Sequence, residues 1–435
     1  MAIGPIPLLR QATPAQRRIL LAAALGWALD AFDTMLYALV LTLLMRDLGM
    51  SKSVAGLLGT LTLLASGAGG ILFGFIADRV GRKRALMASI VTYSVFSFVS
   101  GLSTSIAMLG AARFVLGLGM GGEWNTGATL VAETWPTELR AKAIALVQSS
   151  WAFGFAAAAI VAGPVSRYFG WRAVFFVGIL PALLTLWMRR SVPESELWQR
   201  RSEPSDHSLT GNSSNKPIYI PADAATPSSN QSASFSTIFG PVYRKATFAL
   251  LLFNFFSLFA WWGLFTWMPP YLSLPVSEGG RGFGVFGTTT LLVILNLIGM
   301  FPGYATFGWI ADFLGRRKAF LIYAILAAVL IPFYAAARSP AVLMLMGTMV
   351  AFFGTGLFSG SGIIGSEIFP TTLRARALGF TYNGARAMSS IAPLAIGRVG
   401  QSHGLNAAFY LCAAGYLLAA LAASLLPETR GKALQ

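Results

Sequence analysis

Twelve apolar runs, most of them twenty residues or longer, constrain the fold of this chain more than any other feature. A membrane-spanning helix needs about 20 consecutive, mostly apolar residues. Only helices and closed barrels satisfy their backbone hydrogen bonds in lipid, and these runs are too long for barrel strands. We therefore predict an all-α integral membrane protein with spans near 19–45, 53–76, 85–104, 106–131, 141–165, 171–189, 246–272, 285–311, 319–337, 340–363, 375–398 and 405–426.

The charge content supports this prediction. Only 11% of the 435 residues are charged, whereas a soluble domain carries about 25%, so most of the surface faces something other than water. A net charge of +16 is typical of nucleic-acid-binding proteins. Here the Lys and Arg residues sit in short clusters between apolar runs. We interpret them as anchors next to the lipid and expect no nucleic-acid partner.

The sequence offers little for catalysis or metal binding. The chain has one cysteine, Cys412, and two histidines. These counts exclude a disulfide framework and argue against a structural zinc site. The sequence contains no phosphate-binding loop, HExxH motif or GxSxG elbow. We expect no metal, no cofactor other than a coupling proton, and no enzymatic activity. The first apolar run holds two aspartates and no clear cleavage site, which favours a spanning helix over a signal peptide.

A polar segment at 190–245 divides the chain into two halves, 1–189 and 246–435. It is rich in Ser, Asn and Pro, as a flexible linker is. Of the 32 Lys and Arg residues, 23 fall at the termini, in this segment or in loops on the same side. The positive-inside rule therefore predicts a plasma-membrane protein with both termini and the linker in the cytoplasm. For this reason we discount the glycosylation patterns at Asn212 and Asn230. The seven on the opposite side are Arg46, Lys52, Arg167, Arg172, Arg281, Arg338 and Arg398.

The second half repeats the first at one constant offset. The run GFIADRVGRK at 74–83 matches GWIADFLGRR at 308–317, and ETWPTELRA at 133–141 matches EIFPTTLRA at 367–375. A Pro-Glu pair at 193–194 recurs at 427–428. Three separated matches predict two six-helix halves related by a pseudo-two-fold axis along the membrane normal. This arrangement supports alternating access to a site near the midplane.

These repeated loops, the Pro-Glu helix ends and the run Arg113-x-x-x-Gly117-x-Gly119 resemble the major facilitator superfamily. The resemblance covers nearly the whole chain outside 200–240. It implies the major facilitator fold, with 12 transmembrane helices in two pseudo-symmetric halves. Three stretches are most similar to the sialate and monocarboxylate (lactate–pyruvate type) proton symporters: LDAFD at 29–33, GGEW at 121–124 and YNGAR at 382–386.

Ionisable side chains inside spans are costly and are functional candidates by default. Five lie well inside the predicted spans: Asp30, Asp33, Arg113, Glu123 and Arg386. The repeat positions of the first four hold Leu264, Trp267, Gly347 and Leu357, so the fold alone does not require these charges. Carboxylates crowded in a site of low dielectric constant cannot all stay ionised. We hypothesise that Asp30, Asp33 and Glu123 carry the coupling proton; a static pair between Asp33 and Arg113 is the alternative.

Arg386 lies near the middle of its predicted span with no acid on the same span. Its planar fork suits a substrate carboxylate, and a pair with a first-half acid is the alternative. Arg113 matches the helix-4 arginine of the superfamily, so the resemblance implies a role in coupling or a brace for the first helix; direct contact with the substrate is the other hypothesis. Other candidates for lining a substrate cavity are Asn125, Gln148, Ser149, Asn254, Trp262, Trp267, Tyr382 and Asn383.

The repeated loops place acids beside bases at the cytoplasmic helix ends. The resemblance implies a gating role, in which charge pairs hold the halves closed on that side; simple anchoring of the topology is the alternative. The residues concerned are Asp78, Arg82, Glu133 and Arg140 in the first half, and Asp312, Arg316, Glu367 and Arg374 in the second.

The sequence thus predicts a monomeric, proton-coupled importer of a small organic anion, such as a monocarboxylate or a sugar acid. One alternative is a carrier of a neutral sugar or polyol, with Arg386 purely structural. Another is a proton-antiport exporter of drugs or metabolites. A membrane receptor would need a structured extra domain, and the polar linker predicts none.

Overall fold

The structure, a computed structural model, describes residues 12–195, 198–199 and 235–430. Within these ranges it consists of helices and their connections, without strands. The glycosylation patterns at Asn212 and Asn230 lie outside the described residues, as does most of the predicted linker.

The first half contains six numbered helices. They are α2 (Pro14–Asp47), α3 (Lys52–Val80), α4 (Arg82–Gly101), α5 (Ile106–Thr134), α6 (Thr137–Val177) and α7 (Pro181–Ser191). Helix α6 is interrupted at Gly170, where φ is 78°. The apolar stretch Lys142–Ser191 is 50 residues long, and one crossing takes about 20. The break therefore divides this stretch into two crossings.

The second half is more segmented. It contains η1 (Phe235–Phe239), α9 (Arg244–Ser273), η2 (Val276–Glu278), α10 (Val285–Ile294), η3 (Leu295–Met300), α11 (Phe301–Leu314), α12 (Arg316–Ala336), α13 (Pro340–Ile368), α14 (Thr371–Leu378), η4 (Gly379–Asn383), α15 (Gly384–Ser389) and α16 (Ala392–Ser424). Of these, η3 and η4 are π-helical. Helix α16 breaks at Gly404, where φ is 81°, so the stretch Arg376–Ser424 also makes two crossings.

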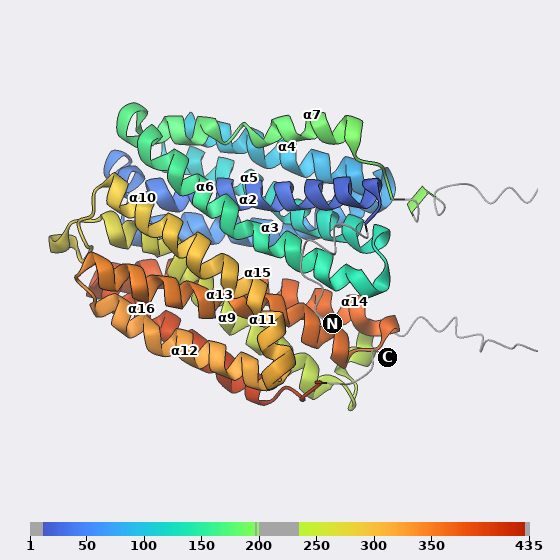
Figure 1. The fold of residues 1–435 in the computed structure, drawn as a ribbon. Helices are drawn as coiled ribbons and strands as arrows, with labels where there is room; N and C mark the ends of the chain where they lie inside the picture. Colours follow the sequence, from blue (N-terminus) through green and yellow to red (C-terminus); the bar gives the residue numbers. More distant parts are fainter. Residues whose placement is uncertain (1–11, 196–197, 200–234, 431–435) are drawn as a thin grey trace, which may run out of the picture.

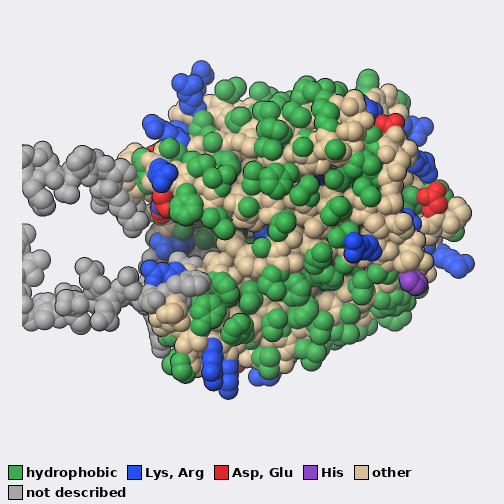
Figure 2. Space-filling view, turned by 180° about the vertical axis from the view of Figure 1, so that it is seen from behind, with side chains coloured by type: hydrophobic (Ala, Val, Ile, Leu, Met, Phe, Trp, Pro, Cys, Tyr) green, Lys and Arg blue, Asp and Glu red, His purple; other side chains and the backbone are tan. Residues whose placement is uncertain are grey.

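Ten stretches of the described chain are long and apolar enough to span a membrane. With the two breaks they make twelve crossings, which confirms the predicted all-α, twelve-helix membrane fold. Figure 1 shows α2–α7 as one bundle and α9–α16 as a second bundle beside it. In Figure 2 hydrophobic side chains cover the sides of the molecule, while many Lys and Arg side chains lie at its two ends.

The start of α2, the end of α7 and the start of α9 lie at one end of the two bundles (Figure 1). We call this the terminal end; it includes Ala12, Ser195, Phe235 and Arg430. The opposite end, with the loops at 48–51 and 274–284, we call the distal end. The halves contact each other through α2 with α9, α3 with α16, and α6 with α10 and α11. Any site between the halves is therefore built from these seven helices and their neighbours.

The turn between α3 and α4 shows how the repeated motif determines local structure. Gly81 has a φ of 106° and its repeat Gly315 has a φ of 100°, a left-handed conformation that favours glycine. A Cβ atom on Gly81 would lie 2.3 Å from Glu194 Oε2, and one on Gly315 would lie 2.7 Å from Glu428 Oε2. The glycine of each loop and the glutamate of each Pro-Glu pair thus form one structural unit, made twice.

Candidate functional site

A cavity lies between the two halves, and we call it the central cavity. Its empty volume is about 350 Å³, including the space at its open side, which is at the lower end of the range for small-molecule sites. It is lined by residues of α2, α6, α9, α11, α13, η4 and α15. These residues are Trp27, Gln148, Trp151, Leu258, Trp261, Trp262, Tyr304, Phe358, Tyr382 and Arg386. The wall is therefore mostly aromatic, with one cation.

Arg386 supplies that cation. Only 6% of its surface is exposed, and its Nε and Nη2 atoms have no hydrogen-bond partner. No acid lies within 4.0 Å to form an ion pair among the described residues, although its charge interacts with Asp30 and Glu123. The π-helical segment η4 ends just before Arg386, and such segments are frequent at functional sites. The guanidinium thus has two nitrogen atoms without a hydrogen-bond partner.

Five tryptophans form a continuous cluster from the first half into the second. The centroids of Trp27 lie 4.4 Å from Trp124 and 4.8 Å from Trp151. Trp151 in turn lies 5.8 Å from Trp261 and 6.0 Å from Trp262. The indole N–H groups of Trp27 and Trp151 are buried without a hydrogen-bond partner. The cluster offers flat faces and two unpaired donors beside Arg386.

Sequence reasoning missed Trp27, Trp151 and Trp261 as lining residues. Of the tryptophans, it proposed only Trp262 and Trp267. The available signal was position: tryptophans favour the two membrane interfaces, whereas Trp27 and Trp151 fall well inside their predicted spans.

The three predicted coupling acids lie close together. Asp30, Asp33 and Glu123 are 1% exposed or less, and the charge of Asp30 interacts with each of the other two. Both oxygens of Asp30 and Oε2 of Glu123 have no hydrogen-bond partner. Gly26 makes room for this arrangement, because a Cβ atom there would lie 2.4 Å from Glu123 Oε1. The structure brings the acids together, and their role in coupling stays a prediction.

Arg113 does not form the static pair with Asp33. It is 2% exposed and its guanidinium lies 4.6 Å from the centroid of the Tyr37 ring. The two charges interact, but no Asp33 oxygen lies within the 4.0 Å of an ion pair. Instead, Asp33 Oδ1 accepts a hydrogen bond of 3.0 Å from Ser97 on α4. The carboxylate faces α4 and Gly178, inside the first half.

The other candidates take different positions. Gln148, Trp262 and Tyr382 line the central cavity. Asn254 lies outside it: Ser361 donates to its side chain at 2.7 Å, and it donates to the Thr381 carbonyl at 3.3 Å. Four more lie outside both this cavity and the second one described below. Asn125 lies against Gly70, Ser149 bonds the Leu146 carbonyl, Trp267 bonds the Pro393 carbonyl, and Asn383 is exposed.

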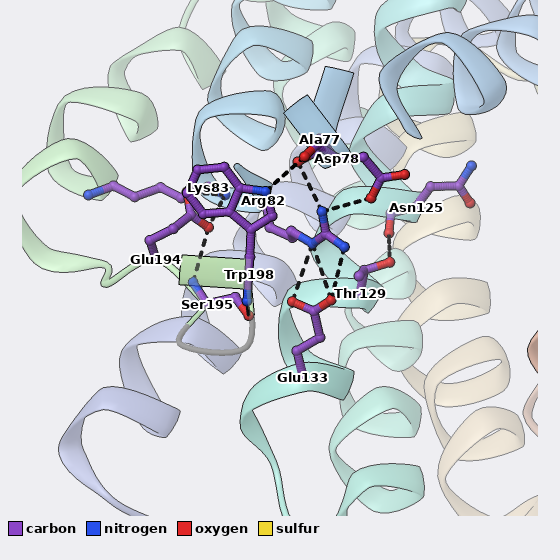
Figure 3. Close-up of polar contacts among 10 residues, drawn as sticks. All are labelled: Ala77, Asp78, Arg82, Lys83, Asn125, Thr129, Glu133, Glu194, Ser195 and Trp198. Atoms are coloured by element: carbon purple, nitrogen blue, oxygen red, sulfur yellow. Dashed lines mark hydrogen bonds and ion pairs between the residues drawn. The ribbon is translucent and has the colours of Figure 1, made fainter. Parts of the chain in front are cut away.

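The first predicted gating cluster surrounds Arg82 (Figure 3). The Arg82 guanidinium contacts Asp78 at 2.8 Å and Glu133 at 3.1 Å. Glu194 accepts from the backbone N–H of Lys83 at 3.0 Å. The Trp198 indole donates to the Asp78 carbonyl at 2.9 Å. These residues tie the start of α4 to the ends of α3, α5 and α7.

The second cluster repeats the first around Arg316, which contacts Asp312 and, at 2.9 Å, Glu367. One expectation is corrected here. The described pairs join helices within one half and do not bridge the two halves, because Arg82 begins α4 directly beside the end of α5. Arg140 donates to the Trp135 carbonyl and Arg374 to the Phe369 carbonyl. A gating role stays a prediction.

At the distal end the two halves are in direct contact through α3 and α16. The Ser53 hydroxyl donates to Gln401 at 2.6 Å, and the Leu394 amide donates to Thr60 at 3.3 Å. A Cβ atom on Gly56 would lie 2.4 Å from the Pro393 carbonyl oxygen. We call these α3–α16 contacts the distal seal. The seal closes the space between the halves on this side.

Residues 23–301 and 280–434 match the sequence profile of the Major Facilitator Superfamily. The chain is 31% identical to the "probable 4-methylmuconolactone transporter" of Cupriavidus pinatubonensis, over 97% of this chain and 93% of that protein. It is 30% identical to the sialic acid transporter NanX of Escherichia coli, over 92% of each chain. A solved D-xylose-proton symporter superposes with a TM-score of 0.74 at 21% identity, over 97% of this chain and 100% of that one, which is a likeness of fold.

Proposed function

The chain belongs to the Major Facilitator Superfamily of membrane transporters, and on this premise we propose that it imports a small organic anion together with a proton. Like its relatives, it is a transporter and not an enzyme. The anion would bind in the central cavity, and the two halves would expose that cavity to each side of the membrane in turn. We propose a monomer in the plasma membrane, with the terminal end in the cytoplasm.

One observation carries this proposal: Arg386 is buried in the central cavity with donors that nothing in the described chain occupies. A buried guanidinium without a partner is costly. A ligand carboxylate would accept two parallel, charge-assisted hydrogen bonds from its fork. An anionic substrate therefore explains the residue better than a neutral one does.

The cavity wall narrows the class of anion. Trp27 and Trp151 offer flat apolar faces and two unpaired N–H donors. Such a wall suits a carboxylate with a planar, unsaturated or aromatic body better than it suits a hydroxyl-rich sugar acid, because the indole rings offer little to bind several hydroxyl groups. The name of the muconolactone-transporting relative is in keeping with this class, and that of the sialic-acid-transporting relative keeps the sugar acids open.

For proton coupling we propose the acid group next to Arg386. Asp30 and Glu123 interact with each other and with Arg386 through their charges. A substrate carboxylate on Arg386 would add a negative charge to the same site. That charge would favour protonation of a neighbouring acid. Binding of the anion and of the proton would thus assist each other, as symport requires.

The test is proton movement in proteoliposomes that contain the purified protein and a pH-sensitive dye. The panel is nicotinate, cis,cis-muconate, sialate, lactate, glucose and xylose. We expect the external medium to become alkaline when one or more of the acids is added, and to stay unchanged with either sugar. A response to a sugar alone would favour the neutral-solute carrier. Efflux of an acid driven by inward proton flow would instead establish an exporter.

A further inference from the structure

A second cavity lies between the halves, between the central cavity and the distal end, and we call it the distal cavity. Its lining comes from α2, α3, α5, α9 and α16 and consists of Thr34, Met35, Tyr37, Ala38, Gly59, Thr62, Leu63, Arg113, Trp262, Thr266 and Pro393. Trp262 lines both cavities. The two spaces are therefore neighbours along one path between the halves.

Arg113 is the charged group of the distal cavity. It is 2% exposed, and its Nε and Nη1 atoms have no hydrogen-bond partner. The Tyr37 ring, 4.6 Å away, covers one face of the guanidinium by a cation–π contact but accepts none of its N–H groups. Arg113 thus resembles Arg386 in its burial, its unpaired donors and its place on a cavity wall.

Asp33 is the acid whose charge interacts with Arg113, but it does not accept hydrogen bonds from the Arg113 guanidinium. Asp33 accepts a hydrogen bond from Ser97 and lies against Gly178, so its carboxylate faces the interior of the first half. The lining also includes three threonines. The hydroxyl groups of Thr34 and Thr62 donate to the backbone carbonyls of Asp30 and Leu58, which leaves the Thr266 hydroxyl as the donor that suits an anionic ligand. A carboxylate in the distal cavity would meet the Arg113 donors and the Thr266 hydroxyl.

The distal seal lies directly beyond this cavity. Pro393 belongs to both: it lines the cavity, and its carbonyl packs on Gly56. When the seal opens, the distal cavity is the first space between the halves that an arriving solute reaches. Arg113 is then the first buried cation on the path, and Arg386 is the second.

We propose that the distal cavity is a second carboxylate-binding site, in which Arg113 holds the substrate anion before it moves past Trp262 to Arg386. This inference rests on the proposed function, because it assumes an anionic substrate. It adds a site that is separate from the central one and has its own cation.

The test uses 4-azidobenzoate, an aromatic carboxylate that attaches to neighbouring residues on illumination. The full chain in lipid nanodiscs is labelled, digested and analysed by mass spectrometry. We expect two sets of adducts that excess benzoate suppresses. One set lies on the walls of the central cavity. The other lies on distal-cavity residues such as Met35, Thr62 or Thr266.

Variants separate the two sites. Arg113→Gln should lower the distal adducts about tenfold or more, because a charge-assisted pair of hydrogen bonds is lost, and should leave the central adducts in place. Arg386→Gln should do the reverse. Since loss of a buried arginine can impair folding, Ala38→Leu provides a second route. It fills the distal cavity without removing a charge, and should abolish the distal adducts alone.

Two results would overturn the inference. If central adducts form and no distal adducts are found, the second site does not exist while the proposed function stands. The same holds if distal adducts survive both Arg113→Gln and Ala38→Leu. If no adduct is found in either cavity, the proposal that the two cavities bind a carboxylate is wrong.

Discussion

The terminal ends of the two halves are built alike, whereas their interiors differ. Arg82 lies between Asp78 and Glu133, and Arg316 lies between Asp312 and Glu367 with the same connectivity. Inside the membrane, four of the five buried charges belong to the first half: Asp30, Asp33, Arg113 and Glu123 against Arg386 alone.

This difference separates the scaffold from the chemistry. A feature that the repeat preserves is needed twice, so it serves the fold or the motion of both halves. A charge that the repeat does not preserve is not required by the fold, and at 0–6% exposure it is costly to keep in lipid. This difference supports the proposal that the unrepeated residues bind the substrate and the proton, and that the repeated ones serve the movement of the two halves.

The strongest test of this division is Arg386→Gln. Truncating one partner of a buried charge pair costs about 2–5 kcal/mol, so anion uptake in proteoliposomes should fall about 30-fold or more. Arg398→Gln is the matched control, an exposed arginine on the same helical stretch, and should stay near the unmodified rate. Equal losses in both variants would show that Arg386 has no special place in transport.

Glu123→Gln tests the proton side against its own repeat position. We expect proton-driven accumulation of the anion to fall about tenfold or more, because the variant cannot release a proton, while exchange of labelled for unlabelled anion continues. Both are measured in the same vesicles. Leu357→Met, a volume-conserving change at the repeat position, should affect neither. Accumulation that persists in Glu123→Gln would transfer the coupling role to Asp30 or Asp33.

The repeated clusters give a smaller and symmetrical expectation. Arg82→Gln and Arg316→Gln each remove the centre of one cluster, and uptake should fall by similar factors of about three to thirty, since each leaves a partly buried glutamate without its pair. Arg317→Gln, an exposed neighbour, serves as the control. A large loss of uptake in one of these two variants and none in the other would show that the two clusters are not equivalent.

The smallest effect concerns Glu428. Partial burial raises the pKa of its carboxyl, but the backbone N–H groups of Arg430, Arg316, Arg317 and Thr429 lower it more, so the pKa lies below its usual value of 4.5. A lowered pKa in the folded state contributes stability that is present above about pH 4.5 and is lost as the pH falls below it.

Glu428→Gln should therefore destabilise the protein by less than about 1 kcal/mol at pH 7, the usual size of a carboxylate effect at a helix N-terminus. The measurement is thermal unfolding in detergent between pH 7 and pH 3.5. The difference between variant and parent should shrink as the pH falls. A difference that stays constant over this range would exclude the carboxylate charge as its cause.

The sequence was sufficient to predict the twelve crossings, because length and hydropathy alone decide whether a helix can span lipid. It also identified the buried charges, since an ionisable residue in an apolar run is conspicuous. It did not reveal the π-helical segments at 295–300 and 379–383, which carry no local pattern. Nor did it separate Gln148, which lines the central cavity, from Asn254, which bonds across helices, because both are polar residues in mid-span and only the packing tells them apart.

The composition of the distal seal has a consequence for the speed of the transport cycle. Its closest contacts join Gly56 to the Pro393 carbonyl at 2.4 Å, Gly59 to the Pro393 ring at 3.1 Å, and Gly397 to the Lys52 carbonyl at 2.5 Å, each measured from a Cβ atom placed on the glycine. Glycine and proline have no rotamer freedom to lose when they are buried. Apart from Lys52, Ser53 and Gln401, whose side chains bond across the halves, closing this end freezes few side chains, and the conformational-entropy barrier to closing and reopening it is small.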